Sequence, residues 1–184
     1  MKNLDFALRA LFNVKSRVVF SVVGSKEDKE YFDYCQSIAR DVPKNVDVIW
    51  SDAIEHSQIA GVMASNDFLF VPTRGENFGH VILESLSVGT PVLISDRTPW
   101  RGLEQLGVGY DLPLNDWDVF AKRIEEISSL DTTTMQLMRA RAIEYANHHE
   151  LLKDAIAAQR AMFLRALADG PSALHVEGSA GVAS

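Results

Sequence analysis

The sequence predicts an α/β domain in which a mostly parallel β-sheet lies between two layers of helices. From Arg17 to Ile94, short β-branched or aromatic runs alternate with longer segments of helical spacing, a pattern typical of βαβ units. The runs Val18–Phe20 and Phe68–Val71 are apolar on both alternating faces, so we expect central strands covered by helices on both sides. With 184 residues, the chain is long enough for one sizeable core and too short for two ordinary domains.

The individual elements follow from hydrophobic periodicity and from helix caps. Strands are expected at Arg17–Val23, Val46–Trp50, Asp67–Val71, Pro91–Ser95 and Val108–Leu112. Helices are expected at Leu4–Phe12, Asp28–Asp41, Ser57–Ser65, Phe78–Val88, Asp116–Ile127, Thr132–Ala146 and His149–Leu167, with Asp116 and Asp131 as N-caps. Residues 169–184 are rich in small side chains and have no period. We therefore expect a domain over residues 1–168 and a flexible tail over residues 169–184.

The composition excludes several classes of function. The formal charge of −7 argues against non-specific nucleic-acid binding, which needs a basic face. The single Cys35 lies in a helical pattern and is expected in the core, and no cluster of residues has the spacing of metal ligands. No apolar run approaches the length that spans a bilayer, and no signal pattern opens the chain, so we expect a cytoplasmic domain.

The most informative segment runs from Val71 to Glu84, where a strand leads through a loop flanked by Gly75 and Gly79 into a helix. Open α/β sheets place ligands at the carboxyl ends of their strands. Glycine permits positive φ or a close backbone approach, and the first amides of a helix direct N–H groups and positive potential into the same space. The segment therefore predicts a site for an anion or a polyol.

Two carboxylates flank the start of that helix. Glu76 stands in the loop, and Glu84 falls near the second turn of the helix, eight residues later. A carboxylate accepts two hydroxyl hydrogen bonds at once, which suits the vicinal diol of a ribose or a hexose. Spacing alone is weak evidence, because glutamates eight apart are common in helical proteins.

The flanking residues strengthen this interpretation. The pair resembles the E-x7-E signature of the retaining glycosyltransferases of family four, which have the GT-B fold of two facing Rossmann-like domains. Three neighbouring segments resemble that family too: Ala64–Asp67, Pro72-Thr73 and Glu84–Val92. Residues 1–11 are similar to the start of the family's second half, so the resemblance extends from about Lys2 to Ile127. It implies a Rossmann-like, three-layer domain that is one half of a GT-B fold.

The resemblance also implies roles for individual residues. The residue matching Glu84 holds the ribose of a nucleotide-diphosphate sugar, and the residue matching Glu76 faces the donor sugar. Lys2 matches the lysine that neutralises the diphosphate. The expected donor contacts are completed by the loop amides of Asn77, Phe78 and Gly79, by the glycine turn at Gly24, and by Arg74, which supplements Lys2. The donor is a UDP, GDP or ADP sugar, and the scheme needs neither a metal nor a further cofactor.

Two features of the family are missing from this chain. Its Arg-x5-Lys pair would place the arginine before Met1, and its central first strand and its acceptor-binding half precede Lys2. We therefore expect a domain lacking its first strand, with a rearranged sheet or self-association through the open edge. We also expect the isolated chain to be inactive in transfer. A full-length parent could act at the inner face of the membrane.

Three alternatives remain open at this point. The first is a non-catalytic nucleotide-binding or interaction fragment. The second is a GT-B-fold epimerase that acts on a nucleotide sugar. The third is a nicotinamide-binding domain, which is disfavoured because no G-x-G-x-x-G fingerprint is present.

Overall fold

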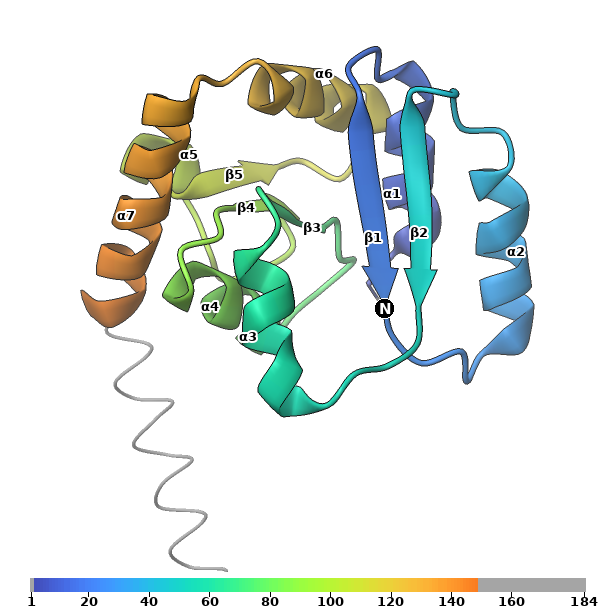
Figure 1. Cartoon of the computed structure of the whole chain (residues 1–184), viewed down its shortest axis with the longest axis horizontal. Coiled ribbons are helices and arrows are strands. Elements are labelled where there is room, and N and C mark those ends of the chain that lie inside the picture. The colour runs from blue at the N-terminus through green and yellow to red at the C-terminus, as the bar shows by residue number, and fades with distance from the viewer. Residues whose placement is uncertain (1, 149–184) are drawn as a thin grey trace, which may run out of the picture. The chain divides into compact units, whose positions relative to one another are not determined.

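The computed structural model describes residues 2–148 and forms an α/β domain whose paired strands are all parallel. Strands β1 (Val18–Val23) and β2 (Val46–Ser51) make a two-stranded sheet. Strands β3 (Leu69–Val71), β4 (Val92–Ser95) and β5 (Gly109–Leu112) make a second sheet in the order β3-β4-β5 (Figure 1). The predicted α/β class with parallel strands is thus confirmed.

The helices surround these two sheets. They are α1 (Leu4–Ala10) with the short 3-10 helix η1 (Leu11–Asn13), α2 (Lys29–Ala39), α3 (His56–Ala64), α4 (His80–Ser87), α5 (Leu103–Leu106), α6 (Trp117–Ser128) and α7 (Thr132–His148). Every predicted element within residues 2–148 is present, with ends that differ by a few residues. The predicted helix at His149–Leu167 and the predicted tail at 169–184 lie outside the described residues.

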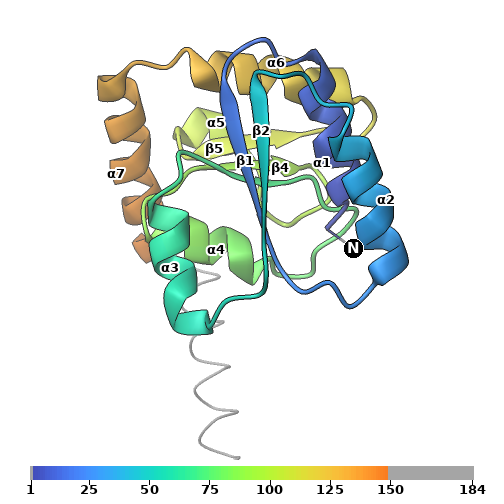
Figure 2. The ribbon, with the colours of Figure 1, turned by 45° about the vertical axis from the view of Figure 1, so that its right-hand side comes forward.

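The prediction that β1 is a central strand covered on both faces is wrong. In residues 2–148, the ladder of β1 joins it only to β2. On one face of this pair, Val19, Val23 and Ile49 are 54%, 39% and 49% exposed. Figure 2 shows β1 and β2 running steeply across the direction of β5 instead of extending its sheet. The apolar run predicted a strand at β1 correctly. Which segments cover the two faces of that strand, however, depends on the tertiary structure.

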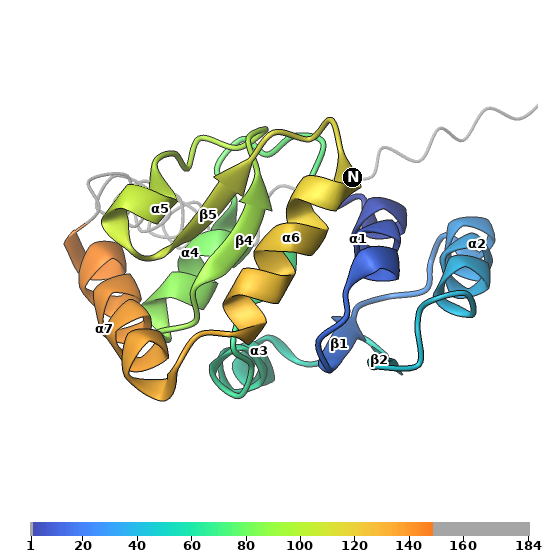
Figure 3. The same cartoon turned by 90° about the horizontal axis from the view of Figure 1, so that it is seen from above.

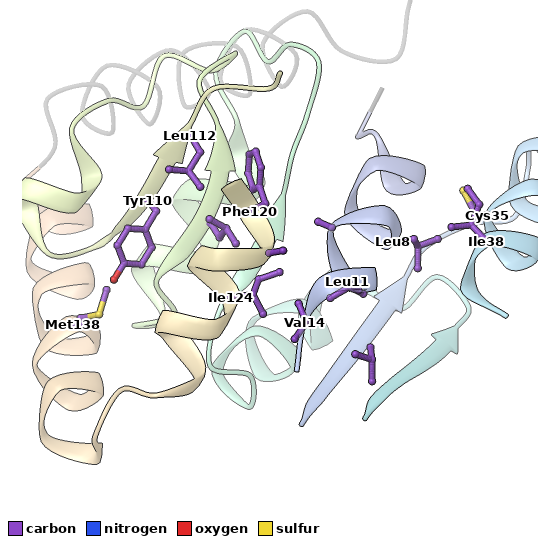
Figure 4. Close-up of a cluster of buried hydrophobic side chains, with 14 residues drawn as sticks. Leu8, Leu11, Val14, Cys35, Ile38, Tyr110, Leu112, Phe120, Ile124 and Met138 are labelled. Atoms are coloured by element: carbon purple, nitrogen blue, oxygen red, sulfur yellow. The ribbon is translucent and has the colours of Figure 1, made fainter. Parts of the chain in front are cut away.

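One hydrophobic core connects the two sheets. Helix α1 packs between α2 and α6 (Figure 3). Figure 4 shows Leu11 and Val14, from the start of the chain, beside Ile124 of α6, the helix that also carries Phe120. These side chains are at most 8% exposed, and the rings of Phe70 in β3 and Phe120 stack with centroids 5.8 Å apart. The core fixes β3, and with it the loop that follows β3.

Side-chain caps explain several helix starts. Asp116 accepts the amide of Asp118 at 2.9 Å, and Asp131 accepts the amide of Thr134 at 2.8 Å, so both predicted N-caps are confirmed. The helix α5 was not predicted. It is a single turn whose first amide, on Leu103, is held by the distant carboxylate of Asp111 at 2.9 Å. A contact of this kind leaves no local signal in the sequence.

Glu125 of α6 links that helix to the chain entering β1. Its carboxylate accepts the amides of Ser16 and Lys15 and the hydroxyl of Ser16. These hydrogen bonds, led by the one from the Ser16 amide, hold the pKa of Glu125 below its ordinary value, although burial acts in the opposite direction. A lowered folded-state pKa stabilises the fold above the ordinary glutamate pKa.

We expect Glu125→Gln to lower the free energy of unfolding at pH 7, because the charged acceptor is lost. The difference from wild type should shrink as the pH falls below the ordinary glutamate pKa and through the lowered one, where the wild-type carboxylate also becomes protonated. Urea titrations at pH 7 and pH 3 measure this difference. The exposed Glu30→Gln serves as the control, and a difference independent of pH would contradict the expectation.

Candidate functional site

The loop of residues 72–79 connects the carboxyl end of β3 to α4. It ends at Gly79, which has φ +80° and forms the N-cap of α4, so the helix begins at His80, two residues later than predicted. The carbonyl of Gly79 accepts the amides of Ile82 and Leu83 at 2.9 and 3.3 Å. The amides that precede Ile82 have no acceptor within the helix and carry the positive end of its dipole. They make this loop suitable for an anion.

Lys2 and Glu76 come together at this loop. The Lys2 ammonium donates to a Glu76 carboxylate oxygen, and the two side chains are 59% and 18% exposed. Ion pairs with an exposed partner contribute at most about 1 kcal/mol to stability. A negatively charged ligand can therefore replace Glu76 as the partner of the Lys2 ammonium at a small cost in free energy. The structure brings together two residues that are 74 positions apart in the sequence.

Asn3 fixes the position of Lys2 and was not predicted. Its buried side chain donates from Nδ2 to the Pro72 carbonyl at 3.0 Å. Its Oδ1 accepts the Arg74 Nε–H at 2.9 Å. Asn3 has φ +64°, a left-handed conformation that asparagine adopts more readily than most residues. The only sequence signal was an asparagine at the start of a helical pattern.

Arg74 is turned toward α1 by this contact. Besides its bond to Asn3, its guanidinium lies 3.9 Å from the Asp5 carboxylate. It lines a cavity of about 400 Å³ between α1 and the start of α6, together with Arg9 and Trp117. The prediction that Arg74 supplements Lys2 remains a prediction, since the contacts of Arg74 are on α1.

Glu84 lies in the second turn of α4, as predicted. The side chain is partly exposed, and in residues 2–148 the structure gives its carboxylate no ion pair or hydrogen bond. A partly buried carboxylate with unused acceptor capacity is suited to ligand hydroxyls. Among the loop residues expected to contribute amides, Asn77 is exposed, Phe78 is partly exposed and Gly79 is buried.

The two other glycines of the predicted site differ from Gly79. Gly75 has no positive φ, and a Cβ added there would meet nothing within 4 Å. Gly24, at the carboxyl end of β1, also has open space, and its amide donates to the Ser51 carbonyl at 3.3 Å. Within residues 2–148 no hydrogen bond or ion pair joins Gly24 to the Lys2–Glu76 loop. Its predicted part in the site therefore stays a prediction.

A second segment supports the loop from the side of β4. The Glu76 amide donates to the Arg97 carbonyl at 3.1 Å, and the Trp100 indole donates from Nε1 to the Phe78 carbonyl at 2.7 Å. These contacts have no signal in the sequence beyond the position of residues 96–100 at the end of the neighbouring strand.

The described part of the chain lacks two other kinds of feature, a cluster of metal ligands and a membrane-spanning helix. Residues 2–148 contain no group of three or more His, Cys, Asp or Glu side chains placed to hold a metal ion. None of the helices in the same range combines the length and apolarity that crossing a membrane requires.

Comparison with known proteins gives a family and a fold. The sequence pattern of the family described as glycosyl transferases group 1 matches residues 1–149. No curated protein sequence matches the chain. Among solved structures, the chain is similar to WaaG, a glycosyltransferase involved in lipopolysaccharide biosynthesis, with 18% identity and a TM-score of 0.66. That match covers 82% of this chain and 40% of WaaG.

Two other solved structures have the same fold. HepE from Anabaena, in complex with UDP and glucose, has 20% identity and a TM-score of 0.68, covering 88% of this chain and 45% of HepE. Sucrose-phosphate synthase from Thermosynechococcus elongatus has 21% identity and a TM-score of 0.65, covering 91% of this chain and 43% of the synthase. The chain thus spans less than half the length of these proteins, and its Rossmann-like fold matches one half of their GT-B fold.

Proposed function

The chain belongs to the glycosyl transferases group 1 family, and on this basis we propose that it is the donor-binding half of a retaining glycosyltransferase. Its ligand is a nucleotide-diphosphate sugar, and the sugar transferred is a hexose. The observation that carries the proposal is the juxtaposition of Lys2, Glu76 and the α4 N-terminus on one loop at the carboxyl end of β3.

The chemistry of this loop suits such a donor. The diphosphate is an anion, which the Lys2 ammonium and the first amides of α4 attract. Glu84, four residues into α4, has both carboxylate oxygens available for the ribose hydroxyls. Solved structures of HepE contain UDP and UDP-glucose, which favours the same class of ligand here.

In transfer, negative charge grows on the leaving diphosphate while the sugar becomes oxocarbenium-like. Lys2 and the α4 N-terminus stabilise that growing charge, and they stabilise it more strongly than the charge of the ground state. When the donor binds, the diphosphate replaces Glu76 as the partner of the Lys2 ammonium. The Glu76 carboxylate then faces the donor sugar. The acceptor and the groups that bind it belong to the facing half of a GT-B enzyme, so the described domain by itself binds donor without transferring it.

The direct test is calorimetric titration of the purified chain with UDP, GDP and ADP. We expect one nucleotide to bind, and we expect Glu84→Ala to weaken that binding at least tenfold, or about 1.4 kcal/mol. Glu30→Ala removes an exposed glutamate from the first turn of α2 and should leave the affinity unchanged. A folded wild-type chain that binds none of the three nucleotides would refute the proposal.

Two alternatives make different predictions for the same sample. A non-catalytic nucleotide-binding or interaction fragment would bind nucleotide without releasing or transferring sugar, even when an acceptor-binding half is supplied. An epimerase would convert the nucleotide sugar into a stereoisomer, which proton NMR of the products would detect. The family assignment favours the transferase over the epimerase.

A further inference from the structure

The indole of Trp100 makes a specific contact with the loop of the candidate site. Trp100 is 1% exposed, and its Nε1–H donates to the carbonyl oxygen of Phe78 at 2.7 Å. The ring also packs edge-on against the Phe78 ring, with centroids 6.2 Å apart. A buried indole N–H requires an acceptor, so this contact fixes both partners.

The Trp100 ring is itself held in place. The Trp100 amide donates to the Thr98 hydroxyl at 3.2 Å, and the ring packs edge-on against Tyr145 of α7 at 6.2 Å between centroids. Burial raises the pKa of Tyr145, with a contribution from the Asp111 carboxylate, so this ring stays neutral at physiological pH. Trp100 is therefore a rigid support and not a surface side chain.

Two further bonds from the same segment reach the loop. The Arg97 carbonyl accepts the Glu76 amide at 3.1 Å, and the Ser95 hydroxyl donates to the Thr73 carbonyl. Residues 95–100 thus hold the loop at its beginning, middle and end. Of these three contacts, that of Trp100 is made by a large side chain. It holds Phe78, which directly precedes Gly79, the N-cap of α4.

The direction of the Phe78 carbonyl has a consequence for Gly79. In a trans peptide the C=O of one residue and the N–H of the next point in opposite directions. Because Trp100 holds the Phe78 carbonyl on its own side, the Gly79 N–H points away from Trp100. The same peptide leads into the left-handed conformation of Gly79, with φ +80°, from which α4 starts.

We infer that Trp100 is a positioning residue, which orients the Phe78–Gly79 peptide so that the Gly79 amide and the α4 N-terminus face the donor diphosphate sugar. This inference rests on the proposed function for the identity of the ligand. Trp100 touches no ligand itself and acts through the loop. The variant Trp100→Phe keeps an aromatic ring and removes the indole donor.

The first experiment examines the loop without any ligand. In wild-type protein labelled with 15N-tryptophan, three indole signals are expected, and that of Trp100 should exchange with solvent most slowly. Hydrogen exchange followed by mass spectrometry should show at least tenfold faster exchange of the amides of residues 76–79 in Trp100→Phe. The control Trp50→Phe changes a tryptophan of β2 that packs against Phe32, and it should leave the loop amides unchanged.

The second experiment measures nucleotide affinity in the same variants at a temperature where circular dichroism shows both folded. The ligand is whichever of UDP, GDP and ADP binds the wild-type chain. We expect Trp100→Phe to weaken binding at least fivefold and Trp50→Phe to alter it less than twofold. Faster exchange spread over the whole domain with unchanged affinity would mean a merely structural role and would overturn the inference.

The two proposals fail in different ways. Equal exchange of residues 76–79 in Trp100→Phe and Trp50→Phe overturns the role of Trp100 whatever the binding data are. Faster loop exchange with wild-type affinity overturns it as well, because the donor would then not depend on the loop geometry. If the wild-type chain binds none of the three nucleotides, the proposed function fails, and the donor-positioning role fails with it even when the exchange data show that Trp100 holds the loop.

Discussion

Gly109→Ala is expected to destabilise the domain by roughly 4 kcal/mol, through backbone strain and a steric clash. Gly109 opens β5 with φ +155°, opposite Val92 in the β4–β5 ladder. A Cβ built there would lie 2.2 Å from the Val92 carbonyl oxygen and 2.9 Å from the Val92 nitrogen. Both are backbone atoms of a buried strand, so the ladder itself would have to move.

The loss is measured as the change in the free energy of unfolding in urea. Gly61→Ala is the matched control, because Gly61 lies within α3 and an added Cβ would meet nothing within 4 Å. Alanine in a helix interior favours the helix by about 1 kcal/mol, so this variant should be slightly more stable than wild type. Equal stability of the two variants would show that β5 does not pack against β4 at Gly109.

Gly79→Ala is expected to abolish most nucleotide binding and to destabilise the fold by roughly 2 kcal/mol, the usual scale for a non-glycine residue forced into a left-handed conformation. Its Cβ would lie 2.9 Å from Ile82 Cδ1 and 3.1 Å from Trp100 Nε1. The Ile82 methyl is the far end of a side chain and can move. The Trp100 nitrogen is the donor to Phe78, so the substitution also disturbs the contact that orients the loop.

Gly75→Ala in the same loop is the control. Gly75 has no positive φ and open space around the built Cβ, so alanine there should change stability and affinity little. Thermal unfolding and nucleotide titration of both variants provide the comparison. Wild-type affinity in Gly79→Ala would argue that the donor does not use the start of α4.

Much of the local structure was predictable because it depends on short-range rules. The runs of β-branched residues formed the five predicted strands, and the aspartates before the Trp117 and Thr132 helices cap them. The strand, loop and helix around Gly79 formed as predicted because glycine is the residue that most easily adopts positive φ. The match over residues 1–149 confirms a glycosyl transferases group 1 domain, while the retaining chemistry and the E-x7-E roles of Glu76 and Glu84 stay predictions.

The arrangement of the site was less predictable. Lys2 and Glu76 were predicted to contact the same ligand, but the sequence does not indicate their ion pair. It also does not indicate the hydrogen bond of the neighbouring Asn3 to the backbone of Pro72, 69 positions away. The contacts of Arg74 with Asn3 and Asp5 at the start of α1 were not predicted either. The support from Trp100 depends on the packing of two loops that follow different strands.

The sequence by itself determined the class of the fold, the strands and helices of residues 2–148 other than α5, and the loop that carries the candidate site, because periodicity, caps and glycine conformations act within a few residues. Only the tertiary structure decided that the strands divide into two sheets, that one face of β1 and β2 is exposed, and that Trp100 and Asn3 hold the loop. The reason is physical: hydrogen bonds between distant segments and the pairing of strand edges depend on which surfaces meet in space, and the local pattern of residues does not encode that meeting.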